Sequence, residues 1–106
     1  MQRHAKQRLT PEAAFAKVLR DLRKKAGLSQ EQLGFESGYH RTYMSMLERG
    51  LMNPSLRTIL SVATALGIPA ADMIALIEIT LGHPWREPEK KVGRRALTST
   101  PTNRAE

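Results

Sequence analysis

Residues 27–55 read GLSQEQLGFESGYHRTYMSMLERGLMNPS, and this stretch decides the fold. Ser29 is a typical helix N-cap residue, and the glutamine three positions later completes the pattern of a capping box. Gly38 can adopt the left-handed conformation that ends a helix, so only about two turns fit before it. A second short helix, at about residues 40–49, follows and is closed by Gly50. The stretch therefore predicts two short helices joined by a tight turn.

Helical signals continue on both sides of this stretch. Residues 10–12 read TPE and offer a capping hydroxyl, a proline suited to the first helical position and an acid for the first turn. Ser55 can cap a further helix, which Gly67 would end. Both flanking segments repeat apolar residues at the spacing of one helix face: Phe15, Val18, Leu19, Leu22 and Ala26 in the first, and Leu56, Ile59, Leu60, Ala63 and Leu66 in the second.

The segment at residues 70–81, AADMIALIEITL, is apolar on nearly every side. A helix at a protein surface needs one polar face, so this composition has two interpretations. Either the helix is buried centrally, or its second face meets another chain. In a domain this small we favour the second interpretation and expect a symmetric homodimer.

The chain has 106 residues, enough for one small domain with extensions at its ends. Residues 1–9 are polar and basic, and we expect a flexible arm there. Residues 10–82 hold all of the helical patterns and are predicted to form the folded domain. Residues 83–106 show no periodicity and are rich in polar and charged residues, so we expect a basic, disordered C-terminal tail.

The formal net charge is +7, and most of it lies outside the predicted domain. Residues 1–9 contain three Lys or Arg and no acid, residues 10–81 contain eight against seven acids, and residues 82–106 contain six against three. Basic side chains that neutralise phosphates release condensed counterions, so this distribution favours a nucleic-acid partner. The alternative is that the basic ends are only solvated segments that keep the protein soluble.

Composition also argues against several kinds of site. The chain has no cysteine, so it has neither a disulfide framework nor a thiolate metal site, and its three histidines are widely scattered. We expect no metal and no cofactor. The N-terminus lacks the apolar core of a signal peptide, and no apolar run approaches the ~20 residues that span a bilayer. We therefore expect a cytoplasmic, nucleoid-associated protein without membrane contact.

Five short motifs occur in one order along the chain: Arg23 six residues before Ser29, SQEQL at 29–33, HRTY at 40–43, ERG at 48–50 and NPSL at 53–56. Together they closely resemble the Cro/repressor type of helix-turn-helix protein, often called the XRE family. The resemblance covers about residues 12–78. It implies an all-α, five-helix, lambda-repressor-like DNA-binding domain with the helix-turn-helix at the second and third helices.

In that family the third helix enters the major groove of DNA and the second lies across the sugar-phosphate backbone. The resemblance implies a structural ion pair between the first and third helices, formed by Arg23 and Glu48. It further implies base contacts from Arg41, Thr42, Ser45 and Met46, and backbone contacts from Ser29, Gln30, His40, Tyr43, Arg49 and Asn53. For the homodimer we expect contacts from Ile74, Ile77 and Leu81.

The chemistry of these side chains suits such roles. The guanidinium of Arg41 could fork onto guanine O6 and N7. Gln30 would lie at a helix N-terminus, where free N–H groups favour anions, unless it is a plain first-turn residue. His40 stands where the family usually has a serine or threonine cap, and a protonated imidazole would strengthen a phosphate contact. A turn histidine without ligand is the alternative for His40, and packing is the alternative for Tyr43.

Three residues depart from the family pattern. Gly34 replaces the usual alanine of the second helix, which allows closer helix contact at a cost of up to ~1 kcal/mol in helix propensity. Phe35 stands where a polar residue is common, and Tyr39 replaces a small aliphatic residue in the turn. These departures affect local packing rather than the motif.

Other function classes fit the sequence less well. An enzyme would need a converging set of groups, but Glu31 and Glu36 point different ways on one short helix, and the serines at 29 and 55 are explained as caps. We therefore expect no catalytic residues. An antitoxin-like or adaptor module that binds a protein partner through residues 70–81 and the tail is the alternative function. RNA binding ranks third, since aromatic stacking platforms are lacking.

The sequence as a whole thus predicts a sequence-specific regulator of transcription that binds double-stranded DNA. A homodimer would present one recognition helix per subunit to the two halves of a palindromic operator, ~34–36 Å apart for this motif class. The chain shows no sensor domain. Regulation would then depend on its own concentration, on dimerisation or on a partner protein.

Overall fold

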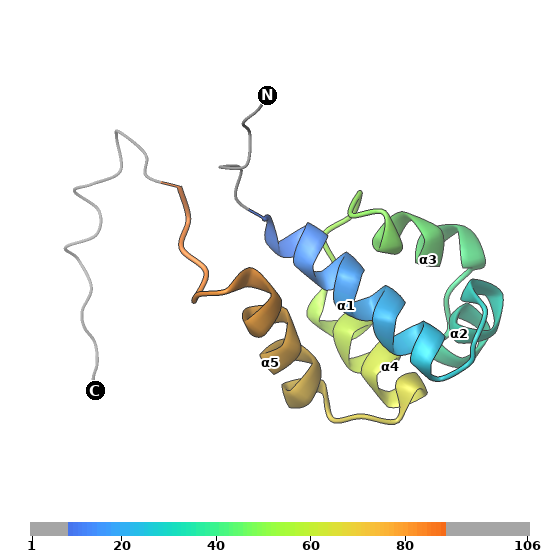
Figure 1. Cartoon of the computed structure of the whole chain (residues 1–106). Helices are drawn as coiled ribbons and strands as arrows, with labels where there is room; N and C mark the ends of the chain where they lie inside the picture. Colours follow the sequence, from blue (N-terminus) through green and yellow to red (C-terminus); the bar gives the residue numbers. More distant parts are fainter. Residues whose placement is uncertain (1–8, 89–106) are drawn as a thin grey trace, which may run out of the picture.

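A computed structural model describes residues 9–88 of the chain, and all of their regular structure is helical (Figure 1). Residues 1–8 of the expected basic arm and residues 89–106 of the expected tail lie outside the described residues, while residues 83–88 are described and form no helix or strand. Five helices run in the order α1 (Pro11–Lys25), α2 (Gln30–Ser37), α3 (Arg41–Glu48), α4 (Leu56–Leu66) and α5 (Ala70–Leu81). The predicted all-α fold of five helices is confirmed.

The residues that begin and end these helices are largely those that local chemistry predicts. The side chains of Thr10, Ser29 and Ser55 each accept a hydrogen bond from a backbone N–H in the first turn of α1, α2 and α4. At the start of α2 the capping box is complete, because the Gln32 side chain accepts in return from the Ser29 N–H. Gly38 ends α2 with a φ of 88°, a left-handed conformation that glycine adopts without strain.

The boundaries of α3 differ slightly from the expected 40–49. His40 is the N-cap and Arg49 the C-cap, so the helix itself spans Arg41–Glu48. The reason is that the His40 imidazole takes over the capping that serine or threonine provides elsewhere. Arg41 is therefore the first residue of the helix.

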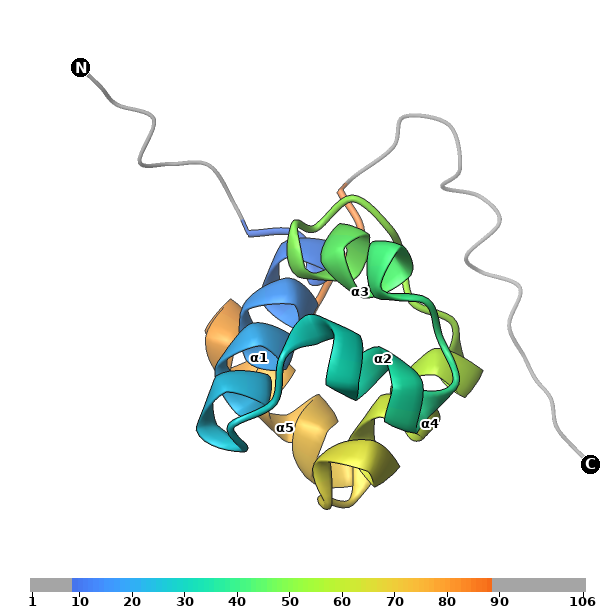
Figure 2. The same ribbon diagram turned by 90° about the vertical axis from the view of Figure 1, so that its right-hand side faces the viewer.

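The helices enclose one small core. Figures 1 and 2 show α1 running between α5 on one side and the α2–α3 pair on the other, with α4 below α2. Contacts between α1 and α5, α1 and α3, α2 and α3, and α2 and α4 hold the elements together. The core consists of side chains from all five helices: Phe15, Val18, Leu19, Leu33, Met44, Leu47, Val62, Ala63 and Met73.

The outer face of α5 remains uncovered. Met73 is the buried residue of this helix, while Ile74, Leu76 and Ile79 are exposed. Central burial of α5, one of the two interpretations of its apolar sequence, is therefore wrong for the single chain. Within residues 9–88 no single helix is long and apolar enough to cross a membrane; α4 and α5 reach that measure only as a pair, which is bent by 105°.

Gly34 lies where α2 and the turn before α3 approach most closely. A Cβ atom at this position would be 2.5 Å from the backbone oxygen of Tyr39 and 3.2 Å from Cγ of Met44. The Tyr39 N–H donates to the Gly34 carbonyl at 2.7 Å, so the two backbones are drawn together here. The sequence indicated a closer contact at Gly34, and the packing of α2 against the turn requires the glycine there.

We expect Gly34→Ala to lower the free energy of unfolding by about 1–3 kcal/mol, because the added methyl group must displace backbone. Urea titration followed by far-UV circular dichroism measures the change. Glu36→Ala, an exposed substitution on the same helix, is the control and should leave the midpoint nearly unchanged. An increase in stability for Gly34→Ala would show that helix propensity dominates and that the close approach is relaxed easily.

Candidate nucleic-acid interface

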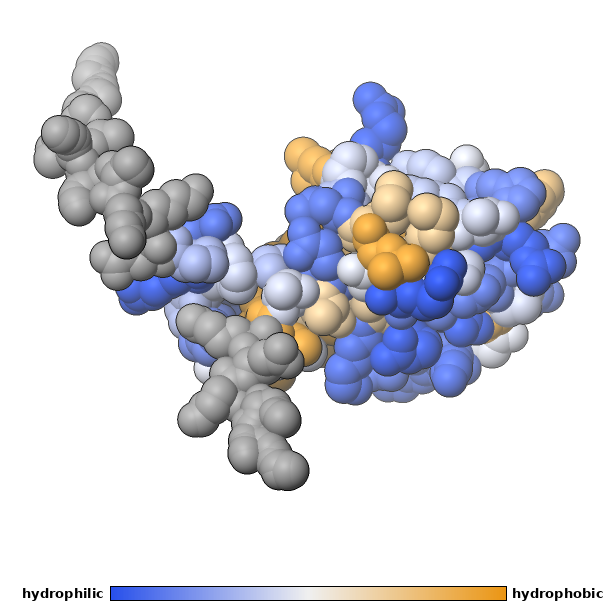
Figure 3. Space-filling model, turned by 90° about the horizontal axis from the view of Figure 1, so that it is seen from above, coloured by the Kyte–Doolittle hydropathy of each residue, from blue (hydrophilic) through white to orange (hydrophobic). Residues whose placement is uncertain are grey.

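The outward side of α3 carries the four side chains expected to contact bases. Arg41 and Thr42 at its start are exposed, and Ser45 and Met46 are half-buried. Met44 and Leu47 point into the core and fix the rotation of the helix. Seen from above, the described face is largely hydrophilic, with small apolar patches among polar side chains (Figure 3). Arg41 also borders a shallow hollow lined by Arg23, Ser29, Gln30 and Glu31, between the start of α2 and the start of α3.

His40 caps α3 with its ring. Its Nδ1 accepts the backbone N–H of Thr42 at 3.0 Å, so the neutral imidazole carries its proton on Nε2. Because His40 is exposed, Nε2 is free to donate to an anion beside the start of α3.

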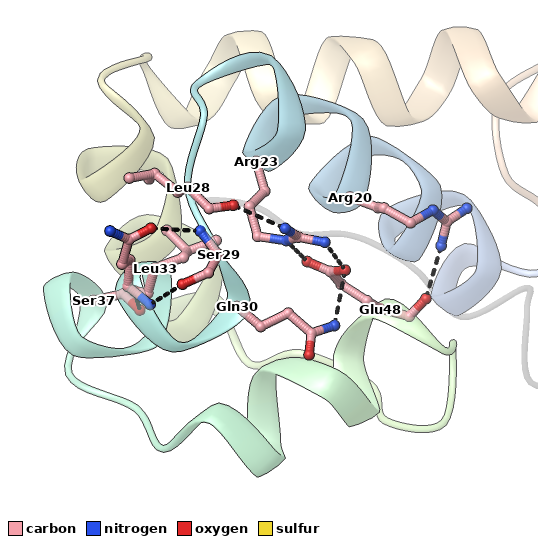
Figure 4. A network of polar contacts seen from close by, with 9 residues as sticks. Arg20, Arg23, Leu28, Ser29, Gln30, Leu33, Ser37 and Glu48 are labelled. Carbon is pink, nitrogen blue, oxygen red and sulfur yellow. Dashed lines mark hydrogen bonds and ion pairs between the residues drawn. The ribbon is translucent and has the colours of Figure 1, made fainter.

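Arg23 and Glu48 join α1 to the end of α3. Arg23 Nε donates to Glu48 Oε2 at 2.6 Å, and its Nη2 donates to Oε1 at 2.9 Å, which makes a forked pair (Figure 4). The two side chains are only 12% and 3% exposed. The hydrogen bond to Glu48 raises the pKa of Arg23 above its ordinary value, against the opposing effect of desolvation. A buried and geometrically matched pair of this kind is strongly destabilised when one partner is removed.

Two further side chains extend this network. Gln30 Nε2, from the first turn of α2, donates to Glu48 Oε1 at 3.1 Å. Arg20 Nη1 donates to the backbone carbonyl of Glu48 at 3.0 Å, while Arg23 Nη1 reaches the carbonyl of Leu28 at 2.8 Å (Figure 4). Glu48 is therefore held from α1 and α2 together, and its bonds set the position of α3. The sequence indicated the ion pair through family resemblance but gave no sign of Arg20 or of the inward bond of Gln30.

The remaining side chains expected at the DNA backbone are arranged as follows. Ser29 caps α2, and Arg49 is exposed at the end of α3. Asn53 Nδ2 donates to Glu12 Oε2 at 2.8 Å, which ties the loop after α3 to the start of α1. The Tyr43 hydroxyl lies 3.1 Å from Thr58 Oγ1 and thus bonds inside the protein.

The residues expected at the dimer interface lie on one side of α5, at spacings of three and four residues, but they differ in exposure. Ile74 is exposed, but Ile77 packs against the core and Leu81 is half-buried. The most exposed apolar side chain of α5 is Ile79, at 72%, and Leu76 lies one turn before it. Ile79 also lines a shallow hollow with Ala75, Glu78, Gly82, His83 and Pro84. Because α5 is apolar on nearly every side, no periodicity in its sequence indicates which face is outward.

Comparison with known proteins gives the chain a clear set of relatives. A family model described as helix-turn-helix matches residues 19–73. Control protein C.BamHI of Bacillus amyloliquefaciens is 43% identical over 61 residues, which cover 57% of this chain and 75% of that protein.

Solved structures agree with this result. The restriction-modification controller protein C.AhdI from Aeromonas hydrophila superposes with a TM-score of 0.57 at 47% identity, over 58% of this chain and 94% of that one. The clp gene regulator ClgR from Corynebacterium glutamicum superposes with a TM-score of 0.66 at 29% identity, over 69% of this chain and 78% of that one. The family match at residues 19–73 includes α2 and α3, the two helices that carry the candidate interface.

We expect Glu48→Ala to lower the free energy of unfolding by about 3–5 kcal/mol, because Arg23 would keep a buried charge without its partner. Thermal and urea melts at neutral pH measure the loss. The matched control is Lys17→Ala, which breaks the exposed pair of Lys17 with Asp21 at 2.8 Å.

The hydrogen bond from Lys17 lowers the pKa of Asp21, but both side chains are more than half exposed, so water and salt screen the pair. The control should therefore leave the melting curve nearly unchanged. Equal effects of the two substitutions would contradict a structural role for the buried pair.

Proposed function

This chain belongs to the helix-turn-helix family, and from that membership we propose that it is a transcriptional regulator that binds double-stranded DNA sequence-specifically through α3. One observation carries the proposal. The short α3 is held by buried polar bonds at its end and by core side chains beneath it, while its first turn is exposed. A rigid helix with an exposed polar first turn is the geometry that major-groove reading requires.

Arg41 is the main candidate for direct base recognition. Its position in the first turn of α3 would bring the guanidinium first into the groove, where it can bond guanine O6 and N7 together. Thr42 is exposed beside it and can bond base edges or phosphates. Ser45 and Met46 follow one turn later, and the Met46 methyl group suits a thymine methyl group.

Backbone contacts would position α3 on the duplex. The Gln30 amide uses one N–H on Glu48, which leaves a second N–H for a phosphate. His40 Nε2 and the Arg49 guanidinium would donate at either end of α3, and the Ser29 backbone lies at the N-terminus of α2. Asn53 would act from the loop after α3.

We further propose that two copies pair through the outer face of α5. To the expected Ile74, Ile77 and Leu81 we add Leu76 and Ile79, which are exposed one turn apart on α5. Ile77 is half-buried and packs against the core. Exposed apolar side chains clustered on one helix are typical of protein contact sites. A symmetric pair would place two α3 helices on the half-sites of a palindrome.

The relatives suggest the biological setting of such a regulator. C.BamHI and C.AhdI are named as control or controller proteins, the latter of a restriction-modification system. We propose a regulator of the same type, whose output depends on its own concentration. Selection of bound fragments from random duplex DNA tests this proposal, and recovery of a palindrome with two equal arms is the expected result.

We expect Arg41→Ala to remove discrimination between the selected operator and competitor DNA, since one bidentate contact contributes ~1–3 kcal/mol of base selectivity. The melting temperature should stay nearly unchanged because Arg41 is exposed. Arg41→Lys is the matched control: it keeps the charge but loses the planar fork, so overall affinity should survive better than selectivity. Fluorescence anisotropy with both duplexes measures the two quantities. Intact selectivity in both variants would refute the assignment.

We expect Ile79→Asp to convert the dimer into monomers and to reduce operator affinity, because a charge would be buried in the α5 contact. Sedimentation velocity gives the mass. Phe35→Asp is the control, since Phe35 is 86% exposed on α2, away from α5. A monomeric wild-type protein that selects DNA with one half-site only would contradict the dimer. If Ile79→Asp instead abolishes binding of a different protein, the adaptor alternative is favoured.

A further inference from the structure

Four hydroxyl groups meet where the turn before α3 touches the first turn of α4. Ser55 Oγ donates to Thr58 Oγ1 at 3.1 Å, and Thr58 Oγ1 donates to the Tyr39 hydroxyl at 3.2 Å. The Tyr43 hydroxyl lies 3.1 Å from the same Thr58 oxygen. The backbone N–H of Thr58 donates to Ser55 Oγ at 3.0 Å, so the cluster is anchored in the N-cap of α4.

Each hydroxyl has one hydrogen and two lone pairs, which fixes the direction of the bonds. Thr58 gives its hydrogen to Tyr39, so the bond with Tyr43 can form only if Tyr43 donates to Thr58. The Thr58 oxygen then accepts from Ser55 and from Tyr43 and is saturated. The hydroxyl hydrogen of Tyr43 therefore forms its bond inside the protein, with Thr58. Tyr39 accepts one bond, and its own hydrogen is left over.

The Tyr39 oxygen that carries this hydrogen is held in a defined place. Thr58 is 2% exposed, so water does not replace it as a partner, whereas Tyr39 is half-buried and reaches the surface. The rings of Tyr39 and Tyr43 lie 5.0 Å apart and tilted by 47°, which restrains both. The backbone of Tyr39 is fixed as well, because its N–H donates to the Gly34 carbonyl.

The position of Tyr39 relates this hydrogen to α3. Tyr39 directly precedes the cap residue His40, and its hydroxyl reaches across to α4. With α3 in the major groove, groups between α3 and the start of α4 face one of the two sugar-phosphate strands that border the groove. Tyrosine hydroxyls are among the groups that commonly donate to DNA phosphates.

We propose that Tyr39 donates its hydroxyl hydrogen to a phosphate oxygen of the bound duplex, and that Tyr43 serves instead as an internal strut between α3 and α4. This inference rests on the proposed DNA-binding function. The resemblance placed Tyr43 at the DNA backbone, with packing as its alternative, and gave Tyr39 only an effect on local packing; the proposal exchanges these two roles.

The test compares Tyr39→Phe with Tyr43→Phe in the full chain, on the duplex selected by the wild-type protein. Each variant loses one internal bond to Thr58, so both should melt at similarly reduced temperatures and control for one another. Tyr39→Phe should in addition lose about tenfold in operator affinity, the scale of one hydrogen bond to a charged group. Tyr43→Phe should retain affinity once it is measured well below its melting temperature.

A set of operators, each with one phosphate replaced by a neutral methylphosphonate, then locates the contact. One replacement near the start of α3 should weaken the wild-type protein and Tyr43→Phe but leave Tyr39→Phe unaffected, because its partner is already gone. The assignment of Tyr39 would be overturned if Tyr43→Phe, rather than Tyr39→Phe, lost affinity and became insensitive to one replacement. It would also be overturned if both variants lost affinity equally and each replacement weakened them as it weakens the wild-type protein. A wild-type protein that selects no duplex would instead overturn the proposed function itself.

Discussion

The carboxylate of Glu48 lies almost entirely out of water, and a charge in such a place is stable only when donors surround it. Arg23 and Gln30 supply three hydrogen bonds to it, and Arg20 bonds the backbone carbonyl of the same residue. These donors come from α1 and α2, whereas Glu48 closes α3. The need to neutralise this buried charge therefore sets the angle of α3 to α1 and α2. That angle also determines where the exposed first turn of α3, which begins with Arg41, points.

Local chemistry made most of the fold predictable. The hydroxyl caps at Thr10, Ser29 and Ser55 and the left-handed glycine at 38 act within one turn of their own position, so the sequence displays them directly. Features that depend on distant partners were not visible in this way. At Gly34 the sequence indicated a closer contact, but not that its partner is the Tyr39 carbonyl in the following turn.

The same difference between local features and distant partners applies to the candidate site. Resemblance to a family pointed to the face of α3 and to the pair of Arg23 with Glu48, but it could not assign hydrogens within a cluster of hydroxyls. Tyr39 and Tyr43 both bond to Thr58, and only the direction of these two hydrogen bonds separates their proposed roles. The sequence was less informative about α5 for a different reason. A helix that is apolar on nearly every side has no polar face, so its sequence does not indicate that Ile77 packs against the core while Ile79 is exposed.

The uncovered face of α5 also has a consequence for dose response. If two copies must join there before either helix α3 is held firmly on an operator, the amount of competent species at low abundance grows as the square of the number of chains made. The response would then stay small while chains accumulate and would rise steeply once enough dimer has formed. The contact made by Ile79 contributes to the affinity between the two copies, so this side chain would help to set the abundance at which the response rises.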